Sequence, residues 1–248
     1  MGILKKLYDK SEITFAIIWI VAYCVLMSVG DSLSATLGIA KSVTLAVGIL
    51  LSAILFAFIK KNGLLKKYGF CLPQESMRRM LYYIPVAVLL TANLWHGVTL
   101  NYNALETVLY ILSMFCVGFL EEVIFRGLLF VAMLKENVKA AIIVSSITFG
   151  MGHILNLING SGAQLVPNLL QVIYATAAGF MFVMVYYRTK SIFICIVTHA
   201  LFNALSAFSD ESALTMTMHI ITCILLTAIT GGYASYIAFT MRKNAKLK

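Results

Sequence analysis

The chain has 248 residues, of which 61% are apolar and only 12% are charged, and its mean hydropathy is +0.92. A soluble domain is typically about 45–50% apolar and about 25% charged. The composition therefore excludes a water-soluble globular fold, a disordered chain and a nucleic-acid-binding domain. It predicts an all-α, polytopic integral membrane protein. The net charge of +9 is then explained by basic cytoplasmic loops rather than by a polyanionic partner.

Eight apolar stretches are candidates for transmembrane helices, since about 20 helical residues cross the hydrocarbon core of a bilayer. We expect these spans at residues 13–30, 42–59, 80–99, 107–134, 141–157, 167–187, 191–208 and 213–240. The first span is interpreted as an uncleaved helix rather than a signal peptide. Segment 60–79, the longest polar stretch, is expected to form an amphipathic hairpin. Residues 1–248 are expected to form one membrane domain.

Basic residues are distributed very unevenly between the two sides of these spans. Of the 19 Lys and Arg residues, Lys41 alone falls in a loop on one side, and Arg126 lies inside the fourth span. The others, including Lys243, Lys246 and Lys248 of the tail, fall on the opposite side. Because basic loops stay in the cytoplasm, the pattern places both termini there and predicts a multi-pass protein of the cytoplasmic membrane.

The fourth span contains three ionisable residues at its middle, in the stretch Glu121-Glu122-Val123-Ile124-Phe125-Arg126. Charged side chains at membrane depth are costly and are therefore candidates for function. Glu122 and Arg126 are four residues apart on one helix face, which suits an ion pair. Glu121 is rotated about 100° away and is less well placed for that pairing. A structural salt bridge is the simpler alternative, but two adjacent carboxylates favour a functional site.

The fifth and seventh spans each carry polar residues spaced four apart. Phe149 precedes His153 in the fifth span, where Gly150 and Gly152 leave room for another helix or a substrate, and His199 precedes Asn203 in the seventh. Each pair alone is explained by hydrogen bonds that join helices. Taken with Glu121, however, these groups fall in a common layer within the membrane, which predicts a shared, partly hydrated cavity.

The remaining two histidines, His96 and His219, fit this layer less well. We interpret His96, beside Trp95 at the end of the third span, as an interfacial residue. His219, early in the last span, is interpreted as structural.

Two kinds of hydrolytic chemistry suit these residues. In the first, Glu121 and His153 orient and deprotonate a water molecule, while His199 and Asn203 stabilise the oxyanion of the tetrahedral intermediate. Glu122 and Arg126 would then hold the helix and Glu121 in position. In the second, Glu121, His153 and His199 bind a zinc ion that activates the water. The residues alone barely separate the two alternatives.

The three ordered motifs, Glu121-Glu122-x-x-x-Arg126, Phe149-x-x-x-His153 and His199-x-x-x-Asn203, resemble those of the CPBP family. That family comprises the CAAX prenyl endoproteases and the bacteriocin-processing or self-immunity proteins, also called the Abi family. The resemblance covers about residues 105–208, which we expect to be the catalytic core. It implies an intramembrane endopeptidase that acts on a peptide or membrane protein. It also implies that Glu121 and His153 activate water, that His199 and Asn203 bind the oxyanion, and that no cofactor is required.

Two other functions remain open at this stage. A non-catalytic bacteriocin immunity protein could keep the same fold without cleaving a peptide. A proton-coupled carrier could use Glu121 and the histidines as a relay, although the sequence has no internal repeat of the kind common in carriers. The expected partners are membrane lipid and a peptide or protein substrate, and nucleic acid is excluded.

Overall fold

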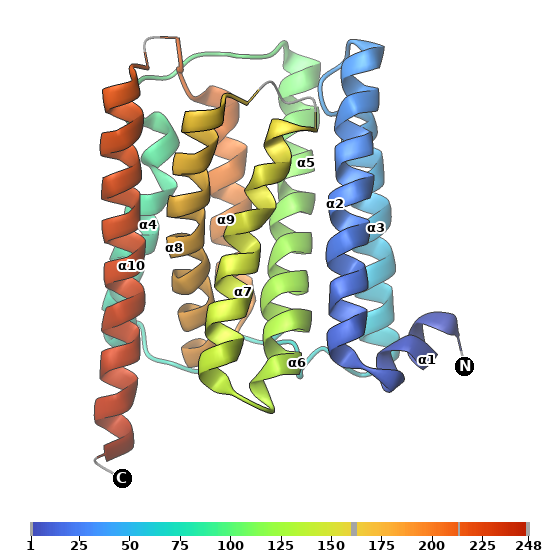
Figure 1. Ribbon diagram of the computed structural model, residues 1–248, viewed down its shortest axis with the longest axis vertical. Helices are drawn as coiled ribbons and strands as arrows, with labels where there is room; N and C mark the ends of the chain where they lie inside the picture. Colours follow the sequence, from blue (N-terminus) through green and yellow to red (C-terminus); the bar gives the residue numbers. More distant parts are fainter. Residues whose placement is uncertain (1, 160–162, 213, 247–248) are drawn as a thin grey trace.

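The computed structural model describes residues 2–159, 163–212 and 214–246. Within these ranges the protein is all-helical, apart from one isolated β-bridge between Val98 and Ser209. The main helices run side by side along one axis, and both termini lie at the same end of the bundle (Figure 1). The expected all-α class is therefore confirmed.

The helices follow one another with short connections. In chain order they are α1 (Ile3–Lys10), α2 (Glu12–Leu37), α3 (Ser42–Lys61), η1 (Arg78–Tyr83), α4 (Ile84–Leu90), η2 (Ala92–Leu94), α5 (Ala104–Glu122), η3 (Val123–Phe130), α6 (Val131–Leu134), α7 (Val138–Gly152), η4 (His153–Leu157), α8 (Leu165–Thr189), α9 (Phe193–Leu205), η5 (Ser206–Phe208) and α10 (Met216–Lys246). The segment η3 is a π-helix that joins α5 to α6 without a break, whereas the other η segments are 3₁₀ turns.

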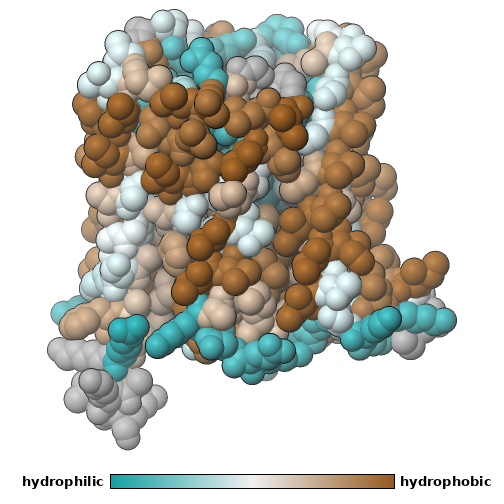
Figure 2. Space-filling view, in the orientation of Figure 1, coloured by the Kyte–Doolittle hydropathy of each residue, from teal (hydrophilic) through white to brown (hydrophobic). Residues whose placement is uncertain are grey.

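Six of these segments are long and apolar enough to cross a membrane. They are Glu12–Leu37, Ser42–Lys61, Ala104–Leu134, Val138–Leu157, Leu165–Thr189 and Met216–Arg242. Each corresponds to one of the eight expected spans, and a wide apolar belt covers the face seen in Figure 2. The protein is thus a multi-pass membrane protein. The count of eight spans and the cytoplasmic location of the termini remain predictions.

The third expected span, residues 80–99, is not one continuous helix. Leu81, Tyr82 and Tyr83 adopt positive φ angles, which bulky residues rarely do, so the backbone is kinked before α4 begins. Pro85 then lies in the first turn of α4, where its missing N–H is tolerated. The helical part ends at Leu94. The seventh expected span, 191–208, becomes the shorter apolar helix Phe193–Phe208.

The expected amphipathic hairpin at residues 60–79 does not form. After α3 the chain makes turns and then has no regular secondary structure as far as η1. It is tied to the bundle because the backbone N–H of Gln74 donates to the carbonyl of Thr189 (2.8 Å) and Glu75 pairs with Arg188 (3.2 Å). The helix with polar and apolar faces at this end is instead α1, which the hydropathy pattern did not reveal because it is only eight residues long.

Charge divides the two ends of the bundle. We call the basic end the one that carries α1, the last turns of α10 and the connections 62–77, 135–137 and 190–192. The expected basic residues of those connections lie there, while Lys248 and the side chains of Lys243 and Lys246 lie outside the described residues. The opposite end carries the connections 38–41 and 95–103. Its basic residue Lys41 is paired with Asp31 at 2.7 Å.

Small residues bring the central helices unusually close together. A Cβ atom added to Gly118 of α5 would lie 2.6 Å from the backbone nitrogen of Ala200 in α9. One added to Gly150 of α7 would lie 2.0 Å from Thr176 Oγ1 in α8. Glycine at membrane helix contacts permits such close backbone approach. The first contact lies next to His199 and one turn before Glu122, so it sets the spacing of the polar site.

Candidate active site

The polar site is built around the change from α-helix to π-helix in the fourth expected span. The π-helical segment η3 begins at Val123, immediately after Glu121 and Glu122. Such π segments inside α-helices are frequent at functional sites. The ion pair expected from the sequence is present: Arg126 Nη1 donates to Glu122 Oε1 at 3.0 Å, and neither side chain is exposed.

Arg126 is enclosed by groups that suit a guanidinium. Its Nη2 donates to the carbonyl of Gly179 in α8 at 3.4 Å. Its central carbon lies 4.1 Å from the centre of the Phe149 ring and 5.2 Å from that of Phe182. Aromatic faces attract cations most strongly where water is excluded. The motif phenylalanine Phe149 therefore supports the charge of Arg126 directly.

His199 links the two glutamates. Its Nδ1 lies 2.9 Å from Glu122 Oε1, and its Nε2 lies 3.6 Å from Glu121 Oε2. An ionised carboxylate can only accept, so the proton on Nδ1 points toward Glu122. Nε2 then carries a proton only when the ring is the doubly protonated imidazolium. The ring stacks on Phe182, with centroids 5.6 Å apart, and this contact fixes its plane.

The charges of this cluster can balance. Glu121 and Glu122 supply two negative charges, and Arg126 and an imidazolium at His199 would supply two positive ones. Burying a charge without a partner costs several kcal/mol, whereas paired and hydrogen-bonded charges are tolerated. The side chain of Glu121 is 14% exposed, whereas that of Glu122 is fully buried. Glu121 is therefore the carboxylate of the pair that water can reach.

Tyr23 of α2 is a site residue that the sequence analysis missed. Its hydroxyl donates to Glu121 Oε1 at 2.5 Å. Tyr23 lies 98 positions before Glu121, so no motif spacing connects the two. A signal was nonetheless present: a tyrosine in the middle of an apolar span, away from the interfacial belt, needs a partner for its hydroxyl group.

We expect Tyr23→Phe to lower kcat/KM for peptide cleavage by about 10- to 100-fold, with the fold intact. The hydrogen bond goes to a charged acceptor, and such bonds contribute about 1.5–3 kcal/mol. Initial cleavage rates in detergent measure the effect. The control is Tyr82→Phe, which removes the same hydroxyl from a side chain that is 61% exposed at the basic end. Equal rates for the Tyr23 variant and the parent would show that this contact does not position Glu121.

A cavity of about 340 Å³ lies beside the cluster. Glu121, His153 and Asn203 line it, together with Tyr23 and Phe149. These residues come from α5, η4, α9, α2 and α7, so the structure brings together groups from four of the expected spans. His199 does not line the cavity. It is 4% exposed and lies behind Glu121, with Nε2 facing the carboxylate.

The backbone at His153 is held by a second residue that the sequence analysis missed. His153 begins η4, where α7 tightens into a 3₁₀ turn. The side-chain nitrogen of Asn168 in α8 donates to the His153 carbonyl at 2.9 Å, and Asn168 is 2% exposed. The ring of His153 meets that of Phe149 edge-on at 5.7 Å. These contacts fix the ring at the cavity wall. Gly152 also lines the cavity, and a Cβ there would meet no atom within 4 Å.

The two remaining histidines lie beside a second cavity, of about 500 Å³. His96 and His219 both line it, and His96 Nε2 is 2.7 Å from Thr222 Oγ1 of α10. His96 was interpreted as interfacial from the sequence, but the structure gives it a hydrogen-bond partner on another helix. The side chains Asn93, Gln171, Tyr174, Phe202 and Glu211 line both cavities. The two spaces therefore adjoin.

In the part of the chain that the structure describes, no group of three or more His, Cys, Asp or Glu side chains is arranged to hold a metal ion. Glu121, His153 and His199, the ligands of the zinc alternative, are not such a group. One ring nitrogen of His199 is engaged by Glu122, an arrangement that metal-binding histidines also show.

These observations define the class of protein: a multi-pass helical membrane protein with a buried Glu–Arg–His cluster beside a polar cavity. Residues 103–205 match the family model for the type II CAAX prenyl endopeptidases, described as Rce1-like. The match supports membership of the CPBP family and overlaps the expected catalytic core, residues 105–208. This family indicates an intramembrane endopeptidase with a peptide or protein substrate. No curated protein and no solved structure matches the chain significantly.

Proposed function

We propose that the protein hydrolyses a peptide bond of a membrane-associated polypeptide, with a water molecule activated by Glu121 and His153. The observation that carries the proposal is that both side chains line one cavity, and that Glu121 is held there by Tyr23 and His199. Glu121 has one oxygen bound to the Tyr23 hydroxyl, while the other faces His199. A carboxylate in this position can accept a proton from water as it attacks the carbonyl carbon.

The oxyanion of the tetrahedral intermediate is stabilised by Asn203, which lines the cavity. The side-chain amide of Asn203 is a donor that needs no change of charge. His199, expected from the sequence to be a second donor, lies behind Glu121 and positions that carboxylate instead. Glu122 accepts from His199 Nδ1 and so orients the ring, and Arg126 holds Glu122 in turn. Hydrogen-bond donors that are held in place in a site with little water stabilise the negative charge that develops on the carbonyl oxygen in the transition state.

No resident metal is part of this proposal, because Glu121 and His153 supply the base and Asn203 supplies a donor for the oxyanion. We expect peptidase activity to persist in EDTA and in 1,10-phenanthroline, and the metal content of the purified protein to be far below one equivalent. Loss of activity with either chelator, restored by added Zn²⁺, would instead support the alternative in which Glu121, His153 and His199 bind zinc.

The function is tested with the purified protein in liposomes, mixed with candidate membrane polypeptides and assayed by mass spectrometry. We expect the parent protein to release defined fragments and His153→Ala to release none, while both give the same unfolding temperature. The control His219→Ala removes a histidine that lines the second cavity but not the first. Cleavage by His153→Ala at the parental rate would contradict the role of His153.

A further inference from the structure

We propose that the substrate enters the site from the side of the membrane opposite both termini. The substrate is then a polypeptide segment at the outer face of the cytoplasmic membrane, and not the prenylated end of a cytoplasmic protein. That the occupant is a peptidase substrate rests on the proposed function. The side of the membrane on which the cavity opens is inferred independently, from the structure and the charge distribution.

The cavity extends from the Glu121 level in one direction only. Its deepest lining residues include Phe125 and Phe149, and it reaches Asp31, Lys41 and Glu211 near the end of the bundle opposite the termini. The second cavity adjoins it and is lined by Ser209 and Leu214 of the connection between α9 and α10, at that same end. The hollow part of the protein is therefore the half that lies away from the basic end.

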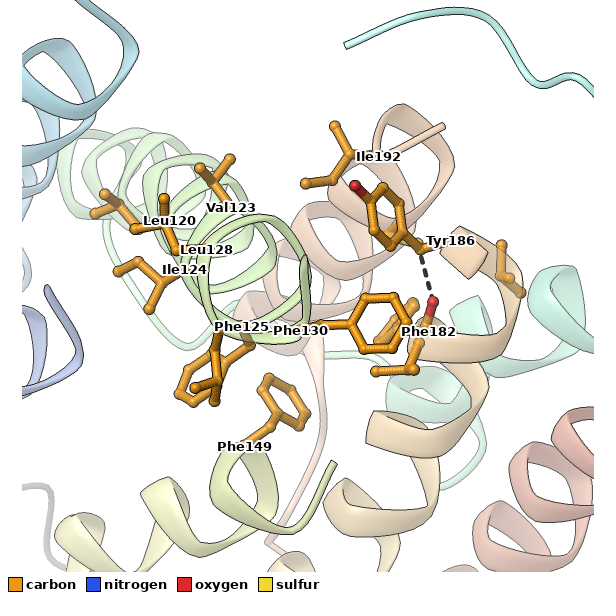
Figure 3. Close-up of a cluster of buried hydrophobic side chains, with 14 of the residues drawn as sticks. Leu120, Val123, Ile124, Phe125, Leu128, Phe130, Phe149, Phe182, Tyr186 and Ile192 are labelled. Carbon is orange, nitrogen blue, oxygen red and sulfur yellow. Dashed lines mark hydrogen bonds between the residues drawn. The ribbon is translucent and has the colours of Figure 1, made fainter. Parts of the chain in front are cut away.

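The other half is closed by packed side chains. Phe125 and Phe149 meet edge-on with ring centroids 5.5 Å apart, directly below the cavity. Beyond them, toward the basic end, the buried residues of Figure 3 fill the space between η3, α8 and the start of α9, among them Leu128, Phe130 and Tyr186, each at most 5% exposed. Among the described residues, this buried layer separates Glu121 from the basic end.

The basic residues set which side this is. Lys60, Lys61, Lys66, Lys67, Arg78, Arg79, Lys135, Lys139, Arg188 and Lys190 gather at the closed end. Lys41 is the basic side chain at the open end, and Asp31 neutralises it. Loops rich in Lys and Arg are retained in the cytoplasm. The closed end is therefore cytoplasmic, and the cavity opens outward.

The cavity lining agrees with a polypeptide occupant. Asn93, Gln171, Asn203, Ser206 and Tyr174 place amide and hydroxyl groups along its walls. Several already bond within the protein, as Asn93 does to the Phe202 carbonyl and Ser206 to the Asn203 carbonyl. Amide and hydroxyl groups can also donate to and accept from a peptide backbone, which an isoprenoid chain cannot match. An extended segment that descends from the outer surface would meet these groups before it reaches Glu121.

The test is the labelling of single cysteines with a membrane-impermeant maleimide in intact cells. The chain offers a natural reporter of the basic end, Cys71, which is part-exposed in the connection 62–77. With the other native cysteines replaced, Leu100→Cys (76% exposed in the parent) reports the opposite end, and Ser28→Cys reports the cavity. We expect Leu100→Cys and Ser28→Cys to react in intact cells, and Cys71 to react only after permeabilisation.

Two results would overturn the proposal. Reaction of Cys71 in intact cells, without reaction of Leu100→Cys, would show that the termini are outside. Reaction of Leu100→Cys without reaction of Ser28→Cys would show that the cavity is closed to the outer water. Labelling requires no peptidase activity, and the same pattern is expected in a Glu121→Gln background. A failure of this inference is thereby distinguished from a failure of the proposed function.

Discussion

Glu121→Gln is expected to lower the rate of peptide cleavage by about 10²–10⁴-fold, the contribution typical of a positioned general base. The amide keeps the shape of the carboxylate and still accepts from the Tyr23 hydroxyl, whose bond in the parent is 2.5 Å long. It cannot accept the proton of the attacking water. The loss should therefore appear in kcat, and the unfolding temperature in detergent should stay close to that of the parent.

The matched control is Glu136→Gln, the same chemical change at an exposed position in the connection between α6 and α7. We expect the parental rate from this variant. Cleavage by Glu121→Gln at the rate of Glu136→Gln would remove Glu121 from the reaction. If cells also gained bacteriocin immunity equally from Glu121→Gln and the parent, the non-catalytic immunity function would be favoured.

Arg126→Met is expected to lower the free energy of unfolding by about 3–5 kcal/mol, the cost of removing one partner of a buried ion pair. Glu122 and Arg126 are both fully buried, and Met keeps most of the side-chain volume while leaving Glu122 without its guanidinium. The ring contacts with Phe149 and Phe182 are weakened as well. Denaturant unfolding in detergent, followed by fluorescence, measures the change.

A pair with the same spacing but an exposed arginine provides the control, and Glu75 of this pair keeps Arg188 as a partner. Arg79 lies 3.5 Å from Glu75, four residues away, and its side chain is 64% exposed. Arg79→Met should cost less than about 1 kcal/mol, because exposed ion pairs contribute little. The double variant Glu122→Gln, Arg126→Met should recover part of the loss, since no charge is then left unpaired. An Arg126→Met variant as stable as Arg79→Met would show that the buried pair does not hold the site together.

The motif residues were found from the sequence because each is costly where it lies. Glu121, Glu122 and Arg126 stand out in a long apolar helix, and their helical spacing predicted the ion pair that the structure shows. Two uncharged polar residues, which cost less than charged ones to bury in a membrane, were not found. Asn168 and Tyr23 are ordinary members of apolar spans until the fold places them against His153 and Glu121. Their roles depend on contacts between helices that are distant in sequence.

Helix boundaries were predicted well where the apolar composition sets them. They were predicted poorly where local backbone geometry sets them. The long apolar helices appear near their expected positions, because about 20 apolar residues in lipid must satisfy their backbone groups as a helix. The third expected span is broken at Leu81–Tyr83, where three positive φ angles occur in residues that carry no turn signal. The packing of Tyr233 against this kink, with its hydroxyl on the Met80 carbonyl at 2.6 Å, belongs to the tertiary structure.

The sequence by itself determined that this is a helical membrane protein with a charged motif inside one span. Composition sets the free energy of transfer into the membrane, and residue spacing sets which side chains share a helix face. The tertiary structure alone decided that His199 lies behind Glu121 rather than in the cavity, and that Tyr23 completes the carboxylate site. It also decided that the cavity occupies one half of the bundle. These features depend on how separate helices pack, and the close approach at Gly118 and Gly150 that fixes this packing is a property of pairs of helices.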